Sequence, residues 1–152
     1  MYRAIFVCSG NLCRSPMAMA LLQHHGSLSG TSVMSLSMGT LDLVGRSAPR
    51  PVLEVMEEIG INLHGHRSQG LRRQLLEHAD GIFAMERHHL DAVCALAPGA
   101  ATRTHLLSEF DPDDPSPIDD PMGKPFGAYL ACRDRLQRII PVLLSRLPGS
   151  EH

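Results

Sequence analysis

A cysteine and an arginine near the N-terminus are the residues whose types and spacing could perform chemistry. The stretch VCSGNLCRSP places Cys8 directly after a run of strand formers and Arg14 six positions later. Between them stand Gly10 and Asn11, which tolerate the left-handed backbone of a loop curled into a cradle. The Ser-Pro pair that follows is typical of a helix start. The pattern therefore predicts a cradle-shaped loop between a strand and a helix.

Such a loop has the properties of an anion site. Backbone N–H groups converge at the N-terminus of the helix, where the helix dipole adds positive potential. The guanidinium of Arg14 adds a fixed cation that can hold two phosphate oxygens at once. The same positive surroundings would stabilise Cys8 as a thiolate, the nucleophilic form of cysteine. We therefore expect displacement at phosphorus, with inorganic phosphate or a similar oxyanion as a ligand of the loop.

The elements that must position this loop alternate between strands and helices. Apolar, β-prone runs predict four strands, at 2–7, 33–37, 81–85 and 101–106. Apolar residues at helical spacing predict helices at 17–25, 51–59, 70–78, 86–97 and 126–147. We expect Gly26 to end the first helix and Pro141 to kink or split the last.

Alternation of this kind predicts an α/β fold, a single doubly wound domain whose parallel sheet carries helices on both faces. In such sheets ligands bind beyond the carboxyl ends of the strands, which is where the Cys8 loop falls. The chain of 152 residues is long enough for one core, so we expect one domain over residues 1–148 and a C-terminal tail at 149–152.

Composition excludes several classes of protein. Apolar residues make up 43% of the chain and charged residues 20%, which argues against disorder. No apolar run approaches the roughly 20 residues of a transmembrane helix, so we expect no membrane partner and a cytoplasmic location. A net charge of -2 without a basic cluster predicts no nucleic-acid partner. The four cysteines form no C-x-x-C pair and are expected to be reduced thiols.

The stretch VCSGNLCRSPMA resembles the phosphate-binding loop of the low-molecular-weight protein tyrosine phosphatases. The likeness covers nearly the whole chain through SMGT at 37–40, GINLHGHRSQGL at 60–71, ADGIFAMERHHLDAV at 79–93 and DDPMG at 119–123. The resemblance implies a four-stranded parallel sheet and a two-step hydrolysis of phosphorylated protein through a cysteinyl-phosphate intermediate. It implies no metal and no other cofactor.

The resemblance also implies roles for the residues of the site. Cys8 would attack phosphorus, while Arg14 and the loop amides would hold the phosphoryl oxygens in the transition state. Ser15 would donate a hydrogen bond to the Cys8 thiolate, and His66 would support the loop through Asn11. The whole phosphate-binding loop comprises Ser9, Gly10, Asn11, Leu12, Cys13, Arg14 and Ser15.

A carboxylic acid must then protonate the leaving oxygen and later activate water. The segment DPDDPSPIDDP offers five aspartates, and matching I-D-D-P-M-G to the family's pattern selects Asp120. A solvated acidic loop is expected for Asp111, Asp113 and Asp114. The segment lacks a calcium-loop pattern. The paired histidines are expected at the surface, because adjacent histidines on a helix point in different directions: His24-His25, His64/His66 and His88-His89.

The residues expected around the cleft do not decide between two classes of substrate. The family walls its cleft with aromatic residues, but here the corresponding places hold Leu41 to Leu43 and Met122-Gly123. An aryl phosphate would lose stacking partners worth about 0.5–1.5 kcal/mol each. The segment DPMGKPFGAY resembles relatives that hydrolyse phosphoarginine, whereas Leu12 resembles the bulky aliphatic residue of the tyrosine-specific members. Phosphotyrosine in proteins is the leading prediction, and phosphoarginine is the alternative.

The remaining cysteines raise two further alternatives. In several family members the neighbouring loop cysteine, here Cys13, forms a reversible disulfide with the nucleophile; otherwise Cys13 packs under the loop. Arsenate reductases share the loop, but they need two further cysteines on a mobile segment, whereas Cys94 and Cys132 fall on predicted helices. A phosphoprotein-binding module without turnover would need neither the nucleophile nor the acid.

Overall fold

The computed structural model describes residues 1–149 and confirms the predicted α/β fold. Its parallel sheet has the order β2-β1-β3-β4, which places β1 and β3 inside. From residue 150 onward, the expected C-terminal tail lies outside the described residues. The strands are β1 (Tyr2–Cys8), β2 (Val33–Gly39), β3 (Gly81–Ala84) and β4 (Thr104–Leu106).

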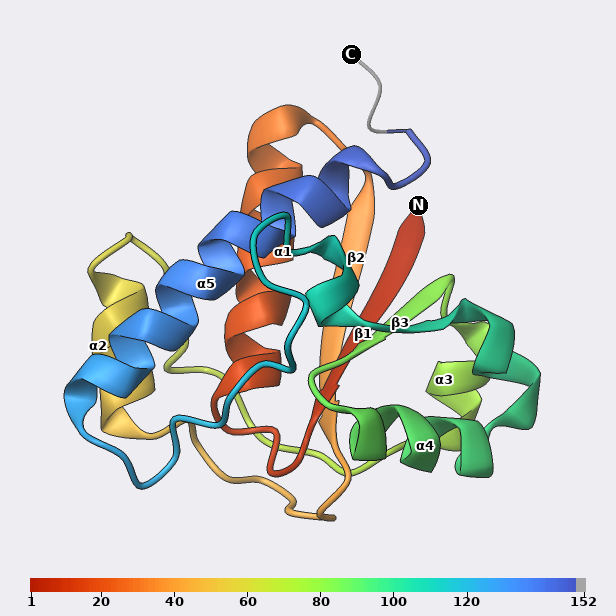
Figure 1. Ribbon diagram of the computed structural model, residues 1–152, viewed down its shortest axis with the longest axis horizontal. Helices are drawn as coiled ribbons and strands as arrows, with labels where there is room; N and C mark the ends of the chain where they lie inside the picture. The colour runs from red at the N-terminus through yellow and green to blue at the C-terminus, as the bar shows by residue number, and fades with distance from the viewer. Residues whose placement is uncertain (150–152) are drawn as a thin grey trace.

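Helices cover both faces of the sheet, as Figure 1 shows. On one face lie α1 (Arg14–Ser29), α2 (Arg50–Glu57) and α5 (Phe126–Ser145). On the other lie α3 (Arg73–His78), α4 (Arg87–Leu96) and the 3-10 helix η1 (Pro98–Arg103). The two cores meet at β1, where Phe6 packs toward α1 and α5 and Ile5 packs toward α3 and α4. Burial of both faces explains why β1 is apolar without alternation.

Helix α1 is longer than the sequence predicted. It begins at Arg14, continues through Gly26 to Ser29 and ends at Gly30, whose φ of 71° is left-handed. The prediction that Gly26 ends the helix was therefore wrong. A Cβ at Gly26 would overlap Cγ1 of Val33, so this glycine allows α1 to pack closely on β2.

Helix α5 runs without a break from Phe126 to Ser145 and contains Pro141. Pro141 therefore does not split the helix, and the predicted kink stays a prediction. Proline removes one helical hydrogen bond, but the residues on both sides of it lie in the core. Burial of this apolar face holds the last turn in place, and its members are Ile139, Ile140, Leu143 and Leu144.

The carboxyl end of β2 lies against the loop that follows β1. Strand β2 continues beyond its predicted end to Gly39, which pairs with Cys8. A Cβ at Gly39 would stand 2.5 Å from the carbonyl oxygen of Ser9 and 2.9 Å from the amide nitrogen of Asn11. Only glycine permits so close an approach, so β2 defines one side of the loop.

Three connections complete the fold. Strand β4 is shorter than predicted because residues 98–103 form η1, and a second 3-10 helix, η2 (Leu107–Phe110), follows it. Residues 111–125, here called the acid loop, join η2 to α5. Within residues 1–149, no helix has both the length and the apolar character required to cross a bilayer.

Candidate active site

The loop between β1 and α1 collects polar groups around the Cys8 thiol. Cys8 Sγ lies 2.9 Å from Ser15 Oγ and accepts the Asn11 N–H at 3.3 Å. The Asn11 side-chain amide donates to Ser15 Oγ at 2.9 Å. The Ser15 hydroxyl proton then has two acceptors within reach, the Cys8 sulfur at 2.9 Å and the Met38 carbonyl at 3.4 Å, and the sulfur is the nearer. These donors stabilise negative charge on Cys8. The loop therefore holds Cys8 in surroundings suited to a nucleophile.

Asn11 keeps the loop curved. Its φ is 58°, and it is the only non-glycine residue within 1–149 that has a positive φ. Its carbonyl accepts the His66 Nε2–H at 2.7 Å, and its Oδ1 accepts the Gln69 N–H at 2.9 Å. The expected contact between His66 and Asn11 is thus present. Burial lowers the pKa of His66, although the bond to the Asn11 carbonyl partly offsets this, so His66 acts as a neutral donor.

Arg14 is a buried cation that joins three segments of the chain. Its exposed fraction is only 1%. Its NH1 donates to Glu86 Oε2 at 2.6 Å and to the Ile118 carbonyl at 2.8 Å, while its NH2 lies 3.6 Å from Asp120 Oδ2. The guanidinium therefore links the phosphate-binding loop to the end of β3 and to the acid loop.

Glu86 and His89 also belong to the site, although the sequence did not single them out. The prediction that His89 lies at the surface was wrong, because its side chain is fully buried. His89 Nδ1 accepts the Glu86 N–H at 3.1 Å, so Nε2 carries the proton and donates to Ser9 Oγ at 2.8 Å. Burial, assisted by His88 and Arg14, lowers the pKa of His89 to about 4. Both residues follow strand β3, whose carboxyl end lies beside that of β1. This position is the sequence signal that could have placed them in the site.

Glu86 and His89, together with His88, form the one group of side chains within residues 1–149 that could hold a metal ion. Glu86, His88 and His89 place their ligating atoms within 4.8 Å of one another. However, both nitrogens of His89 are hydrogen-bonded, and the Glu86 carboxylate is paired with Arg14. Burial alone would raise the pKa of Glu86, but Arg14 outweighs it and the net pKa is lowered. Two of the three possible ligands, Glu86 and His89, are thus engaged in supporting the phosphate-binding loop.

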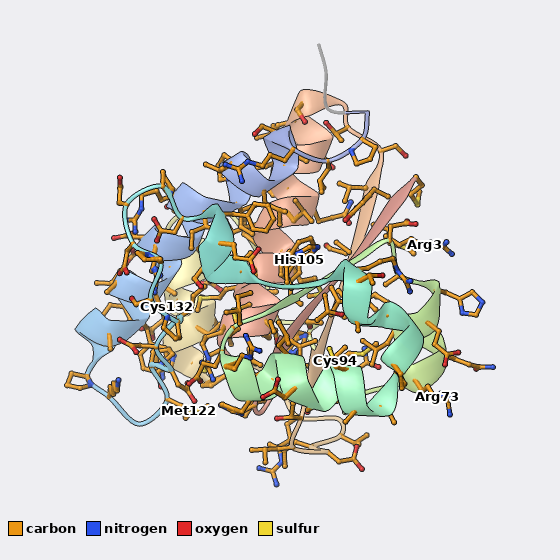
Figure 2. All side chains as sticks on the ribbon, turned by 45° about the vertical axis from the view of Figure 1, so that its right-hand side comes forward. Arg3, Arg73, Cys94, His105, Met122 and Cys132 are labelled. Atoms are coloured by element: carbon orange, nitrogen blue, oxygen red, sulfur yellow. The ribbon has the colours of Figure 1, made fainter. Side chains whose placement is uncertain are left out.

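A pocket of about 150 Å³ opens above Cys8. Its floor is the phosphate-binding loop, Gly10 included, and Asp120 stands at its edge. Its walls are aliphatic, and Figure 2 labels one of them, Met122, in the acid loop. The other wall residues are Leu12, Leu41 and Leu43.

The aspartates of the acid loop have different environments. Asp120 is 44% exposed on its side chain, and its Oδ1 accepts a backbone N–H two residues further on at 3.0 Å. Asp113 is exposed, as expected. The prediction of a solvated Asp111 was wrong, because Arg135 and Arg138 of α5 bind its fully buried carboxylate. Asp120 is the member of this group that reaches both the pocket and Arg14.

All four cysteines are free thiols. Cys13 is buried under the loop, and burial, with Asp120 and Cys8 nearby, raises its pKa far above the usual value. Cys94 and Cys132 lie on α4 and α5, on opposite faces of the sheet, as Figure 2 shows. This placement gives no pair of further thiols beside Cys8 of the kind that arsenate reductases need.

Known proteins are similar to this chain in sequence and fold. The model of the family described as "Low molecular weight phosphotyrosine protein phosphatase" matches residues 3–151. A protein-arginine-phosphatase of Geobacillus stearothermophilus is 37% identical over 96% of this chain and 96% of its own. The low molecular weight protein-tyrosine-phosphatase Wzb of Escherichia coli K12 is 33% identical over 88% of this chain and 87% of its own. The solved structure of a low molecular weight protein tyrosine phosphatase from T. tengcongensis superposes with a TM-score of 0.90 at 30% identity, covering 97% of this chain and 100% of that one.

The buried neutral His89 makes stability depend on pH. Its pKa is about 4 in the folded protein, against an ordinary value of 6.5. Between these values the unfolded chain binds more protons, so the free energy of unfolding falls as the pH drops through this window. His89→Asn keeps an acceptor for the Glu86 N–H but cannot titrate. We predict that the stability advantage of the wild type over His89→Asn shrinks by up to about 3 kcal/mol between pH 7 and pH 4.

Urea unfolding at a series of pH values measures this difference. His78→Asn is the matched control, because His78 is exposed on α3 and is not one of the groups that set the pKa of His89. A difference between the wild type and His89→Asn that stays constant over the whole window would contradict a buried, neutral His89.

Proposed function

We propose that this chain, which belongs to the low molecular weight phosphotyrosine protein phosphatase family, hydrolyses phosphate monoesters on proteins with Cys8 as its nucleophile. The observation that carries the proposal is the convergence of the Cys8 thiol, the Arg14 guanidinium and the Asp120 carboxyl at one small pocket. Phosphoryl transfer requires a nucleophile, a cation for the transferred oxygens and a proton donor for the leaving group, and these three residues supply them.

In the first step, the Cys8 thiolate attacks phosphorus and the P–O bond to the leaving group breaks. Arg14 and the loop N–H groups hold the non-bridging oxygens while negative charge builds on them. Asp120 gives its proton to the leaving oxygen, so the side chain of the substrate departs as a neutral hydroxyl. A cysteinyl phosphate remains on the enzyme.

In the second step, water attacks the same phosphorus atom. Asp120, now a carboxylate, takes the proton from the water, and the P–S bond breaks. The electron pair of that bond returns to Cys8, which is again a thiolate, and inorganic phosphate leaves the pocket. One water is consumed for each phosphate released. The contacts of Ser15 and Asn11 with the sulfur make Cys8 a better leaving group in this step.

Phosphotyrosine in proteins is the substrate that we propose first. Cys8 is only 3% exposed at the pocket floor, so a phosphate must be carried on a side chain that reaches inward. Leu12 at the pocket wall is the bulky aliphatic residue associated with tyrosine-specific members. Phosphoarginine is the second candidate, because the walls offer no ring to stack on and because one relative is named a protein-arginine-phosphatase.

We further propose that Cys13 protects Cys8 during oxidation. Peroxide would convert the Cys8 thiolate to a sulfenic acid and release hydroxide, and the Cys13 thiol would then condense with it to give a disulfide and water. Because the nucleophile must stay reduced to act, we also propose a cytoplasmic location.

The substrate is tested by comparing kcat/KM for matched phosphotyrosine and phosphoarginine peptides, with Cys8→Ser as the blank. We predict that phosphotyrosine is preferred and that Leu12→Thr moves the preference toward phosphoarginine.

Asp120→Asn should lower kcat by about 10²–10⁴-fold while the inhibition constant of inorganic phosphate changes little, because the acid acts on the leaving group.

A preference for phosphoarginine in the wild type would contradict the leading assignment and show that the aliphatic walls decide specificity. Turnover of neither peptide above the Cys8→Ser blank would overturn the enzymatic proposal and favour a phosphoprotein-binding module.

The role of Cys13 is tested by treating the protein with hydrogen peroxide and then with dithiothreitol. We predict that the wild type regains most of its activity and shows a Cys8–Cys13 disulfide by peptide mass spectrometry. Cys13→Ser should regain much less, because its sulfenic acid proceeds to the irreversible sulfinic acid. Equal recovery in both proteins would contradict a protective disulfide.

A further inference from the structure

Arg135 of helix α5 holds the first half of the acid loop at several points. Arg135 Nε donates to Asp111 Oδ2 at 2.9 Å, and its NH1 donates to the Pro117 carbonyl at 2.9 Å. Its NH2 donates to the carbonyls of Ser116 at 2.5 Å and Asp114 at 3.1 Å. The planar guanidinium therefore engages four acceptors along seven residues of the loop, a geometry that the point charge of a lysine cannot reproduce.

Asp111 is the centre of this anchorage. Its buried carboxylate also accepts Arg138 NH2 at 2.8 Å and the backbone N–H groups of Asp113 at 2.9 Å and Asp114 at 3.2 Å. Burial opposes ionisation, but the bonds from Arg138, the Asp113 N–H and Arg135 hold the pKa of Asp111 far below its usual value. The anchorage therefore stays ionised throughout the pH range of an enzyme assay.

A cavity lies between helix α5 and the part of the acid loop that carries Asp120. The cavity measures about 250 Å³, and Figure 2 labels Cys132 on the helix that bounds it. Its lining comes from the loop, with Asp119, Asp120 and Pro121, and from the helix, with Ala128, Cys132 and Arg135. Asp120 itself is half-exposed, so its position depends on the fixed points that flank it. These are Ile118 before it and Met122 after it, whose sulfur accepts the Tyr129 hydroxyl of α5 at 3.9 Å.

Ile118 is the fixed point that connects the two halves. Its N–H donates to the Met85 carbonyl at 3.1 Å, and its carbonyl accepts Arg14 NH1 at 2.8 Å. Asp120 follows two residues later, and Pro117, held by Arg135, directly precedes Ile118. Release of residues 111–117 would therefore leave the two hydrogen bonds of Ile118 as the restraint that precedes Asp120, and the Asp120 carboxyl would be held less firmly.

We propose that Arg135 is a positioning residue for proton transfer by Asp120: by fixing residues 111–117 on α5, it places the acid at the edge of the pocket. The inference rests on the proposed role of Asp120 as general acid. Arg135 is not among the described residues that line the pocket above Cys8, so it acts through the loop and does not touch the reacting atoms.

The test is the dependence of kcat/KM on the leaving group in a series of aryl phosphates. A poor leaving group such as phenol needs the proton of Asp120, whereas dinitrophenol departs readily as an anion. We predict that Arg135→Met lowers kcat/KM about tenfold or more with phenyl phosphate and less than about threefold with dinitrophenyl phosphate. The larger loss is a part of the roughly 10²–10⁴-fold that a general acid contributes to the rate. Arg135→Lys should lie between the wild type and Arg135→Met.

Arg133→Met is the matched control, because Arg133 lies on the same helix with similar burial. Its side chain is 11% exposed, against 14% for Arg135, and it donates to Glu58 and to the Val55 carbonyl. It thus anchors α5 to α2 and, within residues 1–149, makes no hydrogen bond to the acid loop. Arg133→Met should keep the wild-type dependence on the leaving group, even if its stability falls. The thermal midpoint and the inhibition constant of phosphate, measured for each variant, verify folding and an intact phosphate-binding loop.

The outcomes separate the two proposals. The positioning role alone would be overturned if kcat/KM depended steeply on the leaving group in Asp120→Asn but only as in the wild type in Arg135→Met. An equal loss for all leaving groups in Arg135→Met would also overturn it, because a damaged phosphate-binding loop would explain that result. A wild-type dependence in Asp120→Asn would overturn the general-acid assignment, and the role of Arg135 would fall with it.

Discussion

The buried positive charge of Arg14 is the constraint on which the rest of the site depends. A guanidinium removed from water costs several kcal/mol unless it is paired and hydrogen-bonded with good geometry. Its partners come from far along the chain, since Glu86 follows β3 and Ile118 lies in the acid loop. The sheet order makes this possible, because β1 and β3 are neighbours and end on the same side. Satisfying one buried cation therefore assembles the phosphate-binding loop, the end of β3 and the acid loop in one place.

The loop itself meets a second constraint, which is tight curvature without loss of backbone hydrogen bonds. Asn11 accepts the left-handed conformation and saturates its polar groups with His66, Gln69, Ser15 and Cys8. Gly39 lets β2 pass against the outside of the curve. These contacts fix the loop N–H groups before a substrate arrives, and such preorganisation is what makes electrostatic stabilisation of a phosphoryl group effective.

Local signals allowed much of this to be predicted from the sequence. The apolar runs predicted the strands, and the types and order of residues from Cys8 to Ser15 predicted an anion-binding loop at the carboxyl end of β1. The errors have a common physical cause, which is that the deciding partner lies in a different element of the fold. Gly26 resembles a helix end until Val33 is seen against it. His89 is hydrogen-bonded to Ser9, 80 positions earlier in the chain. The Asp111 carboxylate is paired with arginines 24 and 27 positions later.

The central claim is that Cys8 carries the phosphoryl group between the two steps. The most direct measurement is rapid denaturing quench of the enzyme during turnover of an aryl phosphate, followed by mass spectrometry of the peptide that contains Cys8. The account predicts one phosphoryl group on the Cys8 sulfur of the wild type, formed faster than the steady-state turnover, and none in Cys8→Ala, which should also be inactive. Undiminished turnover by Cys8→Ala, or a phosphoryl group on a different residue of the wild type, would contradict it.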